Sequence, residues 1–188
     1  MKNPAPYPHL FFLTGPIQGG KSSLAAELAR VWKKQGGKAG GFLAPGLMQE
    51  GERTGFNLQR VSRDQQIPLA RKTGPASWFT FRRFSFNPEA FRIGMHWLRE
   101  DLQNGADLLI IDEVGPLELQ GRGWRKVLDH FASVPELLQL WVVRKAVLEE
   151  FKKLWPVPEE QILDLQETQP EDVLLYLNRQ WKKSDKRR

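Results

Sequence analysis

The chain has 188 residues and a formal net charge of +6, with 40% hydrophobic and 27% charged residues. This length and composition predict a soluble globular protein with one domain, residues 1–188, around a core of its own. The absence of cysteine excludes a disulfide framework and a thiolate metal site, and the three histidines are scattered without ligand spacing. The apolar run at residues 10–13 is too short for a signal peptide, and no stretch approaches the ~20 apolar residues of a membrane span, so a cytoplasmic protein without membrane contact is expected.

The first third of the chain alternates strand and helix patterns. A short apolar run predicts a strand at residues 9–13, and apolar residues at helical spacing predict a helix at 21–35 that ends at two glycines. A second strand is predicted at 38–45. Residues 46–87 then form an insertion, in which a hairpin turns at Glu50–Arg53 and residues 77–84 have a strand-like pattern within an irregular segment.

The rest of the chain continues this alternation. Asn87 and Pro88 are suited to the start of a helix over residues 89–103. The elements predicted after it are strands at 106–113, 137–144 and 161–165 and helices at 123–132, 145–154 and 170–182. Continuous apolar strands separated by helices predict βαβ units, in which a parallel sheet carries helices on both faces.

The first functional motif lies between the first strand and the first helix. The sequence GPIQGGKS at residues 15–22 matches G-x-x-x-x-G-K-[ST] at every fixed position. Glycines let the backbone N–H groups of such a loop turn inward, and the helix that follows presents its own free N–H groups to the same anion. We therefore expect a phosphate-binding loop made of Gly15, Pro16, Ile17, Gln18, Gly19, Gly20, Lys21, Ser22 and Ser23.

The second motif is a pair of acids at the end of a buried strand. Asp112 closes the apolar run at residues 106–113, and Glu113 follows it directly. Ligands of open parallel sheets bind at the carboxyl ends of the strands, so this pair and the loop should share one edge. A carboxylate there is suited to a Mg²⁺–nucleotide site, and a second acid is suited to orienting a water.

Together these motifs resemble the small P-loop nucleoside-triphosphatase family that has thermophile and human members. The resemblance rests on GGFLAP at 40–45, GERTGF at 51–56 and DEVGPLEL at 112–119, and it extends from about residue 10 to 120. It implies an α/β fold of three layers, with a mostly parallel five-stranded sheet in the RecA-like order 5-1-4-3-2 and a β-hairpin insertion.

The resemblance also implies an activity and roles for residues. It implies hydrolysis of ATP or another nucleoside triphosphate with Mg²⁺, with Lys21 at the phosphates, Ser22 and Asp112 on the metal, and Glu113 activating water. The sequence departs from the family pattern at Gln18, where a glycine is frequent, and at Pro45–Gly46, where the family has an acid.

Two other functions remain open at this point. A small nucleoside or metabolite kinase also combines such a loop with a carboxylate, although no compact arginine-rich lid is evident and adjacent acids favour water activation. A nucleotide-switched binding module would use the insertion, with Trp78, Phe79 and Phe81 as contacts, although core packing accounts for these aromatic residues better.

Basic residues complete the sequence-based expectations. Arg53, Arg71 and Arg144 are candidates for an additional cation at the phosphates, although each is more typical of a surface salt bridge. The basic segment 182–188 favours a solvated terminus over a nucleic-acid contact. The base preference, the physiological substrate and the oligomeric state do not follow from the sequence.

Overall fold

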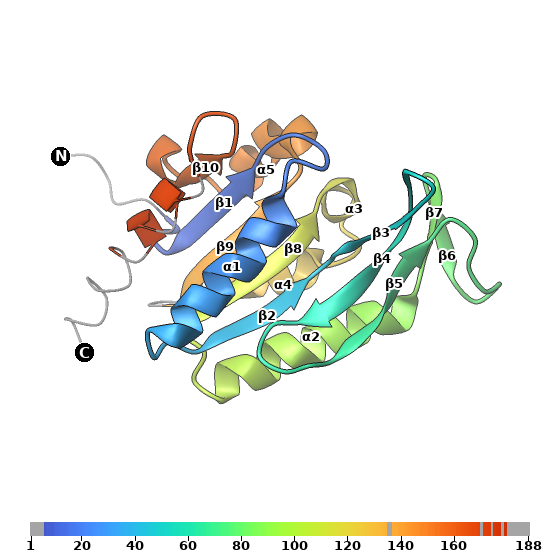
Figure 1. The fold of residues 1–188 in the computed structure, drawn as a ribbon, viewed down its shortest axis with the longest axis horizontal. Helices are drawn as coiled ribbons and strands as arrows, with labels where there is room; N and C mark the ends of the chain where they lie inside the picture. The colour runs from blue at the N-terminus through green and yellow to red at the C-terminus, as the bar shows by residue number, and fades with distance from the viewer. Residues whose placement is uncertain (1–5, 135–136, 170, 174, 178, 180–188) are drawn as a thin grey trace.

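The described part of the protein contains one continuous β-sheet. The structure is a computed structural model that describes residues 6–134, 137–169, 171–173, 175–177 and 179. Ten strands form the sheet in these residues, in the order β10-β1-β9-β8-β2-β4-β5-β7-β6, and β3 pairs with β4 beside this path (Figure 1). The strands are β1 Leu10–Thr14, β2 Ala39–Leu43, β3 Gly46–Gln49, β4 Glu52–Arg60, β5 Gln66–Arg71, β6 Phe79–Phe81, β7 Phe84–Phe86, β8 Leu108–Val114, β9 Leu138–Val143 and β10 Ile162–Asp164.

The parallel half of the sheet has the predicted topology. Strands β10, β1, β9, β8 and β2 pair in parallel with their neighbours. Numbered in chain order among themselves, these five strands follow 5-1-4-3-2, so the predicted α/β P-loop fold is confirmed. Their burial explains the continuous apolar runs, because β1, β2 and β9 are buried at every position.

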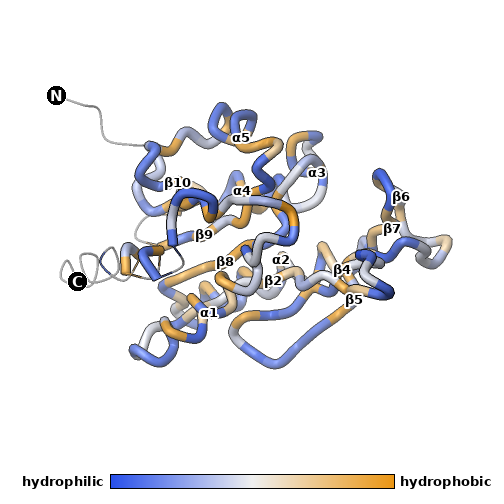
Figure 2. The backbone as a smooth tube through the Cα atoms, turned by 45° about the horizontal axis from the view of Figure 1, so that its top comes forward, coloured by the Kyte–Doolittle hydropathy of each residue, from blue (hydrophilic) through white to orange (hydrophobic). Residues whose placement is uncertain are grey.

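Helices cover both faces of this parallel half. The α-helices are α1 Lys21–Lys34, α2 Pro88–Gln103, α3 Pro116–Leu119, α4 Arg125–Ala132 and α5 Leu148–Leu154, and the 3₁₀ turns are η1 Lys145–Val147 and η2 Glu159–Gln161. Alternate residues of one strand belong to different core clusters: Phe11 packs with α1, whereas Phe12 packs with α2, α4 and α5. The three predicted layers are therefore present, and hydrophobic residues dominate the strands between them (Figure 2).

Most predicted elements agree with the structure to within a few residues. Asn87 Oδ1 accepts a hydrogen bond of 3.1 Å from the N–H of Glu89, and Pro88 is the first residue of α2, as expected. The predicted helix at 145–154 instead begins as the 3₁₀ turn η1, and α3 was not predicted. Of the predicted helix at 170–182, residues 171–173, 175–177 and 179 are helical, and the others lie outside the described residues. None of the helices that the structure describes is long and apolar enough to cross a membrane.

The insertion is larger than the predicted hairpin. The hairpin itself is present as β3 and β4, but β5, β6 and β7 also join the sheet, and all of their pairings are antiparallel. The strand predicted at 77–84 is two strands, because Arg82 adopts a φ of 54° in the turn between β6 and β7. The insertion therefore widens the sheet beyond β2, and β3 and β4 extend past the carboxyl end of β2 (Figure 1).

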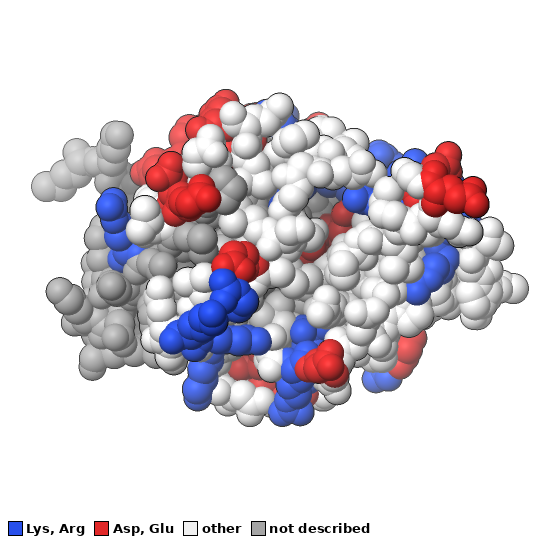
Figure 3. Space-filling view, in the orientation of Figure 1, with Lys and Arg blue, Asp and Glu red and all other residues white. Residues whose placement is uncertain are grey.

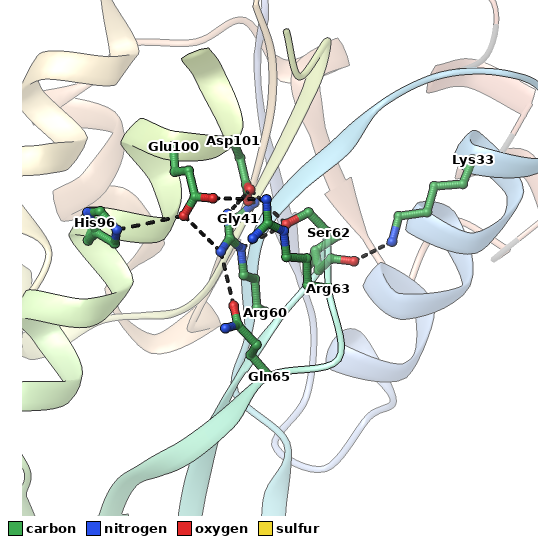
Figure 4. A network of polar contacts seen from close by, with 10 residues as sticks. Lys33, Gly41, Arg60, Ser62, Arg63, Gln65, His96, Glu100 and Asp101 are labelled. Atoms are coloured by element: carbon green, nitrogen blue, oxygen red, sulfur yellow. Dashed lines mark hydrogen bonds and ion pairs between the residues drawn. The ribbon is translucent and has the colours of Figure 1, made fainter. Parts of the chain in front are cut away.

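A buried polar network fastens the insertion to α2. Arg60, at the end of β4, donates to Asp101 and Glu100 of α2, and its side chain is 1% exposed (Figure 4). Asp101 Oδ2 also accepts the N–H of Gly41 at 2.9 Å, so the same carboxylate contacts β2. Because a buried charge needs its partners, this network fixes β4 against the parallel half of the sheet.

The aromatic residues of the insertion are not the exposed contacts that the binding-module hypothesis requires. Trp78, Phe79 and Phe81 are half-buried. The ring of Phe79 lies 5.7 Å from that of Phe86 and 5.9 Å from that of Phe91 on α2. The ring of Phe79 therefore packs the insertion against α2, which removes part of its apolar surface from water.

Candidate active site

The loop at residues 15–22 connects β1 to α1 at the carboxyl edge of the parallel strands. Gly15 has a φ of 147° and Gly20 a φ of 79°, which side-chain-bearing residues rarely adopt. A Cβ atom on Gly15 would also lie 3.1 Å from Cβ of Leu165. Gln18 has a φ of 59°, so the unusual residue of this loop occupies a left-handed conformation where glycine is the unstrained choice. Residues 16–20 are exposed, which leaves the loop open to a ligand.

Lys21 folds back over this loop. Its Nζ donates to the carbonyl oxygen of Gly15 at 3.1 Å and to that of Pro16 at 2.6 Å. Partial burial lowers the pKa of Lys21, and the negative charges of Glu113 and Asp112 oppose that effect. The ammonium group therefore lies within electrostatic reach of both acids, as the shared-edge argument predicted.

Asp112 is buried at the end of β8 and accepts two backbone N–H groups. Its Oδ2 accepts the N–H of Ala44 at 2.9 Å, and its Oδ1 accepts the N–H of Glu113 at 2.7 Å. The side chain of Ser22 lies near enough to this carboxylate to act against a rise of its pKa. Burial, together with the charge of Glu113, raises the pKa of Asp112 to about 6 despite these donors. The two residues predicted to hold a metal thus lie close together.

The donor set at this position fits a cation that arrives with a nucleotide. Ser22 and Asp112 offer oxygen atoms, which Mg²⁺ prefers. No group of three or more His, Cys, Asp or Glu residues is suited to a metal among the residues that the structure describes. A Mg²⁺ ion here would take its other ligands from phosphates and water, as is usual in phosphoryl-transfer sites.

Glu113 is displaced from the regular path of β8. Its φ is 55°, and the pairing of β8 with β9 is irregular between Ile111 and Val114. Its carboxylate receives Arg144, the residue that follows β9, with Nη2 at 2.5 Å and Nε at 3.2 Å from Oε2. The structure therefore brings Arg144 to the edge where the sequence suggested it would lie, in contact with an acid.

The structure places Arg71 elsewhere. Arg71 donates to the carbonyl oxygens of Phe56 and Ala70 and to the side chain of Asn57, all within the insertion. Burial lowers the pKa of Arg71, and none of its contacts is an acid. Its guanidinium group therefore secures the pairing of β4 with β5.

Sequence reasoning assigned no role to Glu118, which supports the turn after the acid pair. Glu118 is 2% exposed, and its carboxylate accepts the N–H groups of Gly115 at 2.8 Å and Trp124 at 3.0 Å. Burial raises the pKa of Glu118 to about 7, although these N–H groups act in the opposite direction. Its spacing from Gly115 is that of a helix capping box, which is the signal that was available in the sequence.

Asp164, to which the sequence analysis assigned no role, lies on β10, on the side of β1 away from β8. Asp164 is aligned with Thr14 in the pairing of β10 with β1, and Lys145 Nζ contacts its carboxylate at 2.9 Å. Burial acts to raise the pKa of Asp164, but the hydrogen bond from Gln166, the contact with Lys145 and the charge of Lys21 together lower it. In Figure 3, acidic atoms lie at the back of a hollow between the loop that precedes α1 and strand β3.

The parallel order 5-1-4-3-2, the glycine-rich loop after β1 and the buried acid on β8 define a P-loop nucleotide-binding protein of the α/β class. Comparison with known families narrows this class, because the family described as NTPase matches residues 10–174. The chain therefore belongs to this NTPase family, and hydrolysis of a nucleoside triphosphate is the activity that the family assigns to it.

Individual relatives carry a name of the same kind. The chain is similar to "Nucleoside-triphosphatase THEP1" of Methanocaldococcus jannaschii, with 30% identity over 118 residues that cover 63% of this chain and 68% of the relative. It is also similar to the protein of that name from Ignicoccus hospitalis, with 34% identity over 110 residues that cover 57% of this chain and 60% of the relative. These matches thus span about two thirds of each relative or less.

Two solved structures share the fold over nearly all of their length. The solution structure of a human cancer-related nucleoside triphosphatase has a TM-score of 0.67 and 22% identity, and the match covers 90% of this chain and 95% of that one. The crystal structure of THEP1 from Aquifex aeolicus has a TM-score of 0.65 and 19% identity, with 89% and 98% covered. At these identities the likeness concerns the fold.

Proposed function

We propose that this chain hydrolyses nucleoside triphosphates with Mg²⁺, using the loop at 15–22 and the acids Asp112 and Glu113. The observation that carries this proposal is the gathering of these groups at one strand edge: Ser22 lies near enough to Asp112 to affect its pKa, Glu113 is the next residue, and Lys21 is within electrostatic reach of both acids. These groups come from different elements, and a phosphoryl-transfer site needs them at one point.

In this proposal the loop binds the phosphate chain. The inward N–H groups and the first turn of α1 favour negative charge, and Lys21 exchanges its contacts with Gly15 and Pro16 for phosphate oxygens. Positive charge at this position stabilises the charge that develops on the terminal phosphate oxygens. Ser22 and Asp112 would hold Mg²⁺, which would neutralise part of that charge when bound.

Glu113 acts on the attacking water. The water oxygen forms a bond to the terminal phosphorus while the bond to the bridging oxygen breaks, so that a nucleoside diphosphate leaves and the water proton passes to the carboxylate. Only Oε2 of this carboxylate is bound by Arg144, and Oε1 has no hydrogen bond to another residue of the described part of the chain. One oxygen is thus available for the water while the other is held in place.

The alternatives have less support. The family match favours hydrolysis over transfer to a second acceptor, and the half-buried aromatic residues of the insertion weaken the binding-module hypothesis. The basic segment 182–188, on which nucleic-acid contact would depend, lies outside the described residues. A single domain over 1–188 and a cytoplasmic location stay predictions.

Phosphate release tests the proposal directly. Purified protein is incubated with Mg²⁺ and each of four nucleoside triphosphates, with and without candidate nucleoside acceptors. We expect release without an acceptor, its loss on chelation of Mg²⁺, and a fall of about 100-fold or more in Lys21→Ala. Lys34→Ala is the matched control, because Lys34 is exposed on the same helix. Release no faster than in Lys21→Ala would refute hydrolysis, and release only with an acceptor would identify a kinase.

A further inference from the structure

Arg53 belongs to the insertion, and its side chain extends toward the candidate active site. It lies near the start of β4, opposite Met48 of β3. Its guanidinium group packs over the ring of Phe56 at 5.1 Å and lies against Gly46, where an added Cβ atom would be 2.8 Å from Nε. Gly46 is two residues beyond Ala44, whose N–H binds Asp112. The side chain therefore packs against the segment that follows β2, which also binds Asp112, and does not lie at the tip of the hairpin.

This guanidinium group has no acidic partner. Its Nε is buried without a hydrogen bond, and within the described ranges no hydrogen bond or ion pair joins Arg53 to another residue. The other two candidate arginines differ, because Arg71 is bound within the sheet and Arg144 is paired with Glu113. A buried donor without a partner costs free energy, so Arg53 is the arginine whose bonding capacity is left for a ligand.

The charge of Arg53 reaches the phosphate loop. After burial, which is the main cause, the charges of Arg144 and Arg53 both lower the pKa of Lys21. The sheet order places β1 and its loop on one side of β8 and its acids, and β2 and β4 on the other side. Lys21 and Arg53 therefore come from elements on opposite sides of β8, and their charges interact, so an anion between them would satisfy both.

We propose that Arg53 is a catalytic residue that contacts the terminal phosphate of the bound nucleoside triphosphate. The proposal rests on the proposed hydrolase function and adds a residue to it. A guanidinium group presents several N–H donors in one plane and keeps its charge at any working pH, which suits the oxygens of a transferring phosphoryl group. It binds the terminal phosphate from the insertion side, while Lys21 binds the phosphate chain from the loop side.

Gly46 is part of this arrangement. A side chain at this position would occupy the space of the Arg53 guanidinium group, and only glycine leaves that space free. Pro45 and Gly46 carry no charged side chain, so this segment offers the guanidinium group of Arg53 no ionic partner.

The test separates contact with the terminal phosphate from other roles of Arg53. We measure kcat and KM for phosphate release, and the affinities for a nucleoside diphosphate and for a non-hydrolysable triphosphate analogue. In Arg53→Ala we expect kcat to fall about 100-fold or more and the affinity for the analogue to fall, while the affinity for the diphosphate stays within about two-fold. Arg53→Lys should recover part of kcat. The matched control is Arg83→Ala, an exposed arginine of the same insertion, which should behave like the wild type.

Gly46→Ala provides a second test that keeps the charge. The new methyl group displaces the far end of a flexible side chain, so kcat should fall several-fold without loss of the fold. A kcat of Arg53→Ala within two-fold of Arg83→Ala would overturn the proposal, as would an equal loss of diphosphate and analogue affinity. If Arg53→Ala does not fold, wild-type kcat in Gly46→Ala overturns it.

These measurements distinguish a failure of the Arg53 proposal from a failure of the proposed hydrolase function. If the wild type releases no more phosphate than Lys21→Ala, hydrolysis fails, but the comparison of diphosphate and analogue affinities still tests the contact. If the wild type hydrolyses nucleotide and Arg53→Ala does so equally fast, only the role of Arg53 fails.

Discussion

Glu113 and Arg144 form an ion pair across two neighbouring strands, with both guanidinium contacts on Oε2 of the carboxylate. Glu113 follows Asp112 on β8, and Arg144 follows β9, so the pair joins the carboxyl ends of two parallel strands. The side chains are 20% and 41% exposed, respectively, and the contact is partly screened by water. Its main consequence is orientation, because the pair fixes one oxygen of Glu113 and leaves the other directed away from Arg144.

Replacement of Glu113 by glutamine should separate binding from hydrolysis. The amide keeps the shape of the side chain but accepts a proton far less readily, so we expect kcat to fall about 100-fold or more while nucleotide affinity is retained. Phosphate release and equilibrium nucleotide binding are measured on the same preparation. Glu150→Gln on α5, an exposed acid, is the control and should match the wild type. Normal hydrolysis by Glu113→Gln would contradict the role of this carboxylate.

Replacement of Arg144 should affect kcat more than KM. Without its partner the Glu113 carboxylate samples several rotamers, and we expect Arg144→Ala to lower kcat about ten-fold with a smaller change in KM. Arg144→Lys supplies the charge without the fixed pair of donors that both reach Oε2, and it should lie between alanine and the wild type. Steady-state kinetics of the three proteins test this order. Faster hydrolysis by Arg144→Ala would show that the pair restrains Glu113 rather than positions it.

Gln18 offers a test of backbone strain in the loop. Its φ of 59° is costly for a residue with a side chain, by about 1 kcal/mol relative to glycine, and more for a β-branched residue. Gln18→Gly should therefore leave the melting temperature unchanged or slightly higher and keep kcat/KM within about three-fold. Gln18→Val should weaken nucleotide binding, because valine disfavours this conformation. A large loss of activity in Gln18→Gly would instead mean that the glutamine side chain contacts the nucleotide.

The parallel half of the fold was predictable because burial on both faces produces continuous apolar strands. Residues 106–113 and 137–144 illustrate this, and their structured counterparts β8 and β9 begin and end within two residues of the predicted limits. The insertion was less predictable. Pro68 interrupts the pattern of β5, where the pairing with β4 is irregular, and the left-handed conformation of Arg82 divides one apparent strand into two.

The candidate site was predictable where backbone spacing determines it. The loop and the acid pair occupy one strand end each, and the parallel topology brings those ends together. The pair of Glu113 with Arg144 and the unpartnered guanidinium of Arg53 depend on side-chain conformations and on local irregularities in the strands, which no sequence period encodes. In the sequence, the role of Glu118 in supporting the turn was indicated only by its capping-box spacing from Gly115.

The network of Arg60 and Asp101 should contribute to stability rather than to catalysis. Their side chains are 1% and 3% exposed, and Asp101→Ala would leave a buried guanidinium group without its main partner. We expect the free energy of unfolding to fall by about 3–5 kcal/mol, with kcat per folded molecule unchanged. Asp129→Ala removes an exposed partner of Arg125 and should cost less than about 1 kcal/mol. Chemical denaturation of the two variants tests this, and equal losses would contradict the importance of burial.

Glu118 should make the stability of the protein depend on pH. Burial raises its pKa from 4.5 to about 7, so the folded protein binds a proton more tightly than the unfolded chain between these values. The free energy of unfolding should therefore fall as the pH rises through this window, by on the order of 3 kcal/mol for this group, and then level off. Asp112, whose pKa is raised to about 6, adds a fall of the same sign. Urea denaturation at several values between pH 5 and 8 measures the slope, which should be shallower in Glu118→Gln and unchanged in Glu150→Gln. Equal slopes for Glu118→Gln and the wild type would mean that Glu118 stays ionised in its buried position.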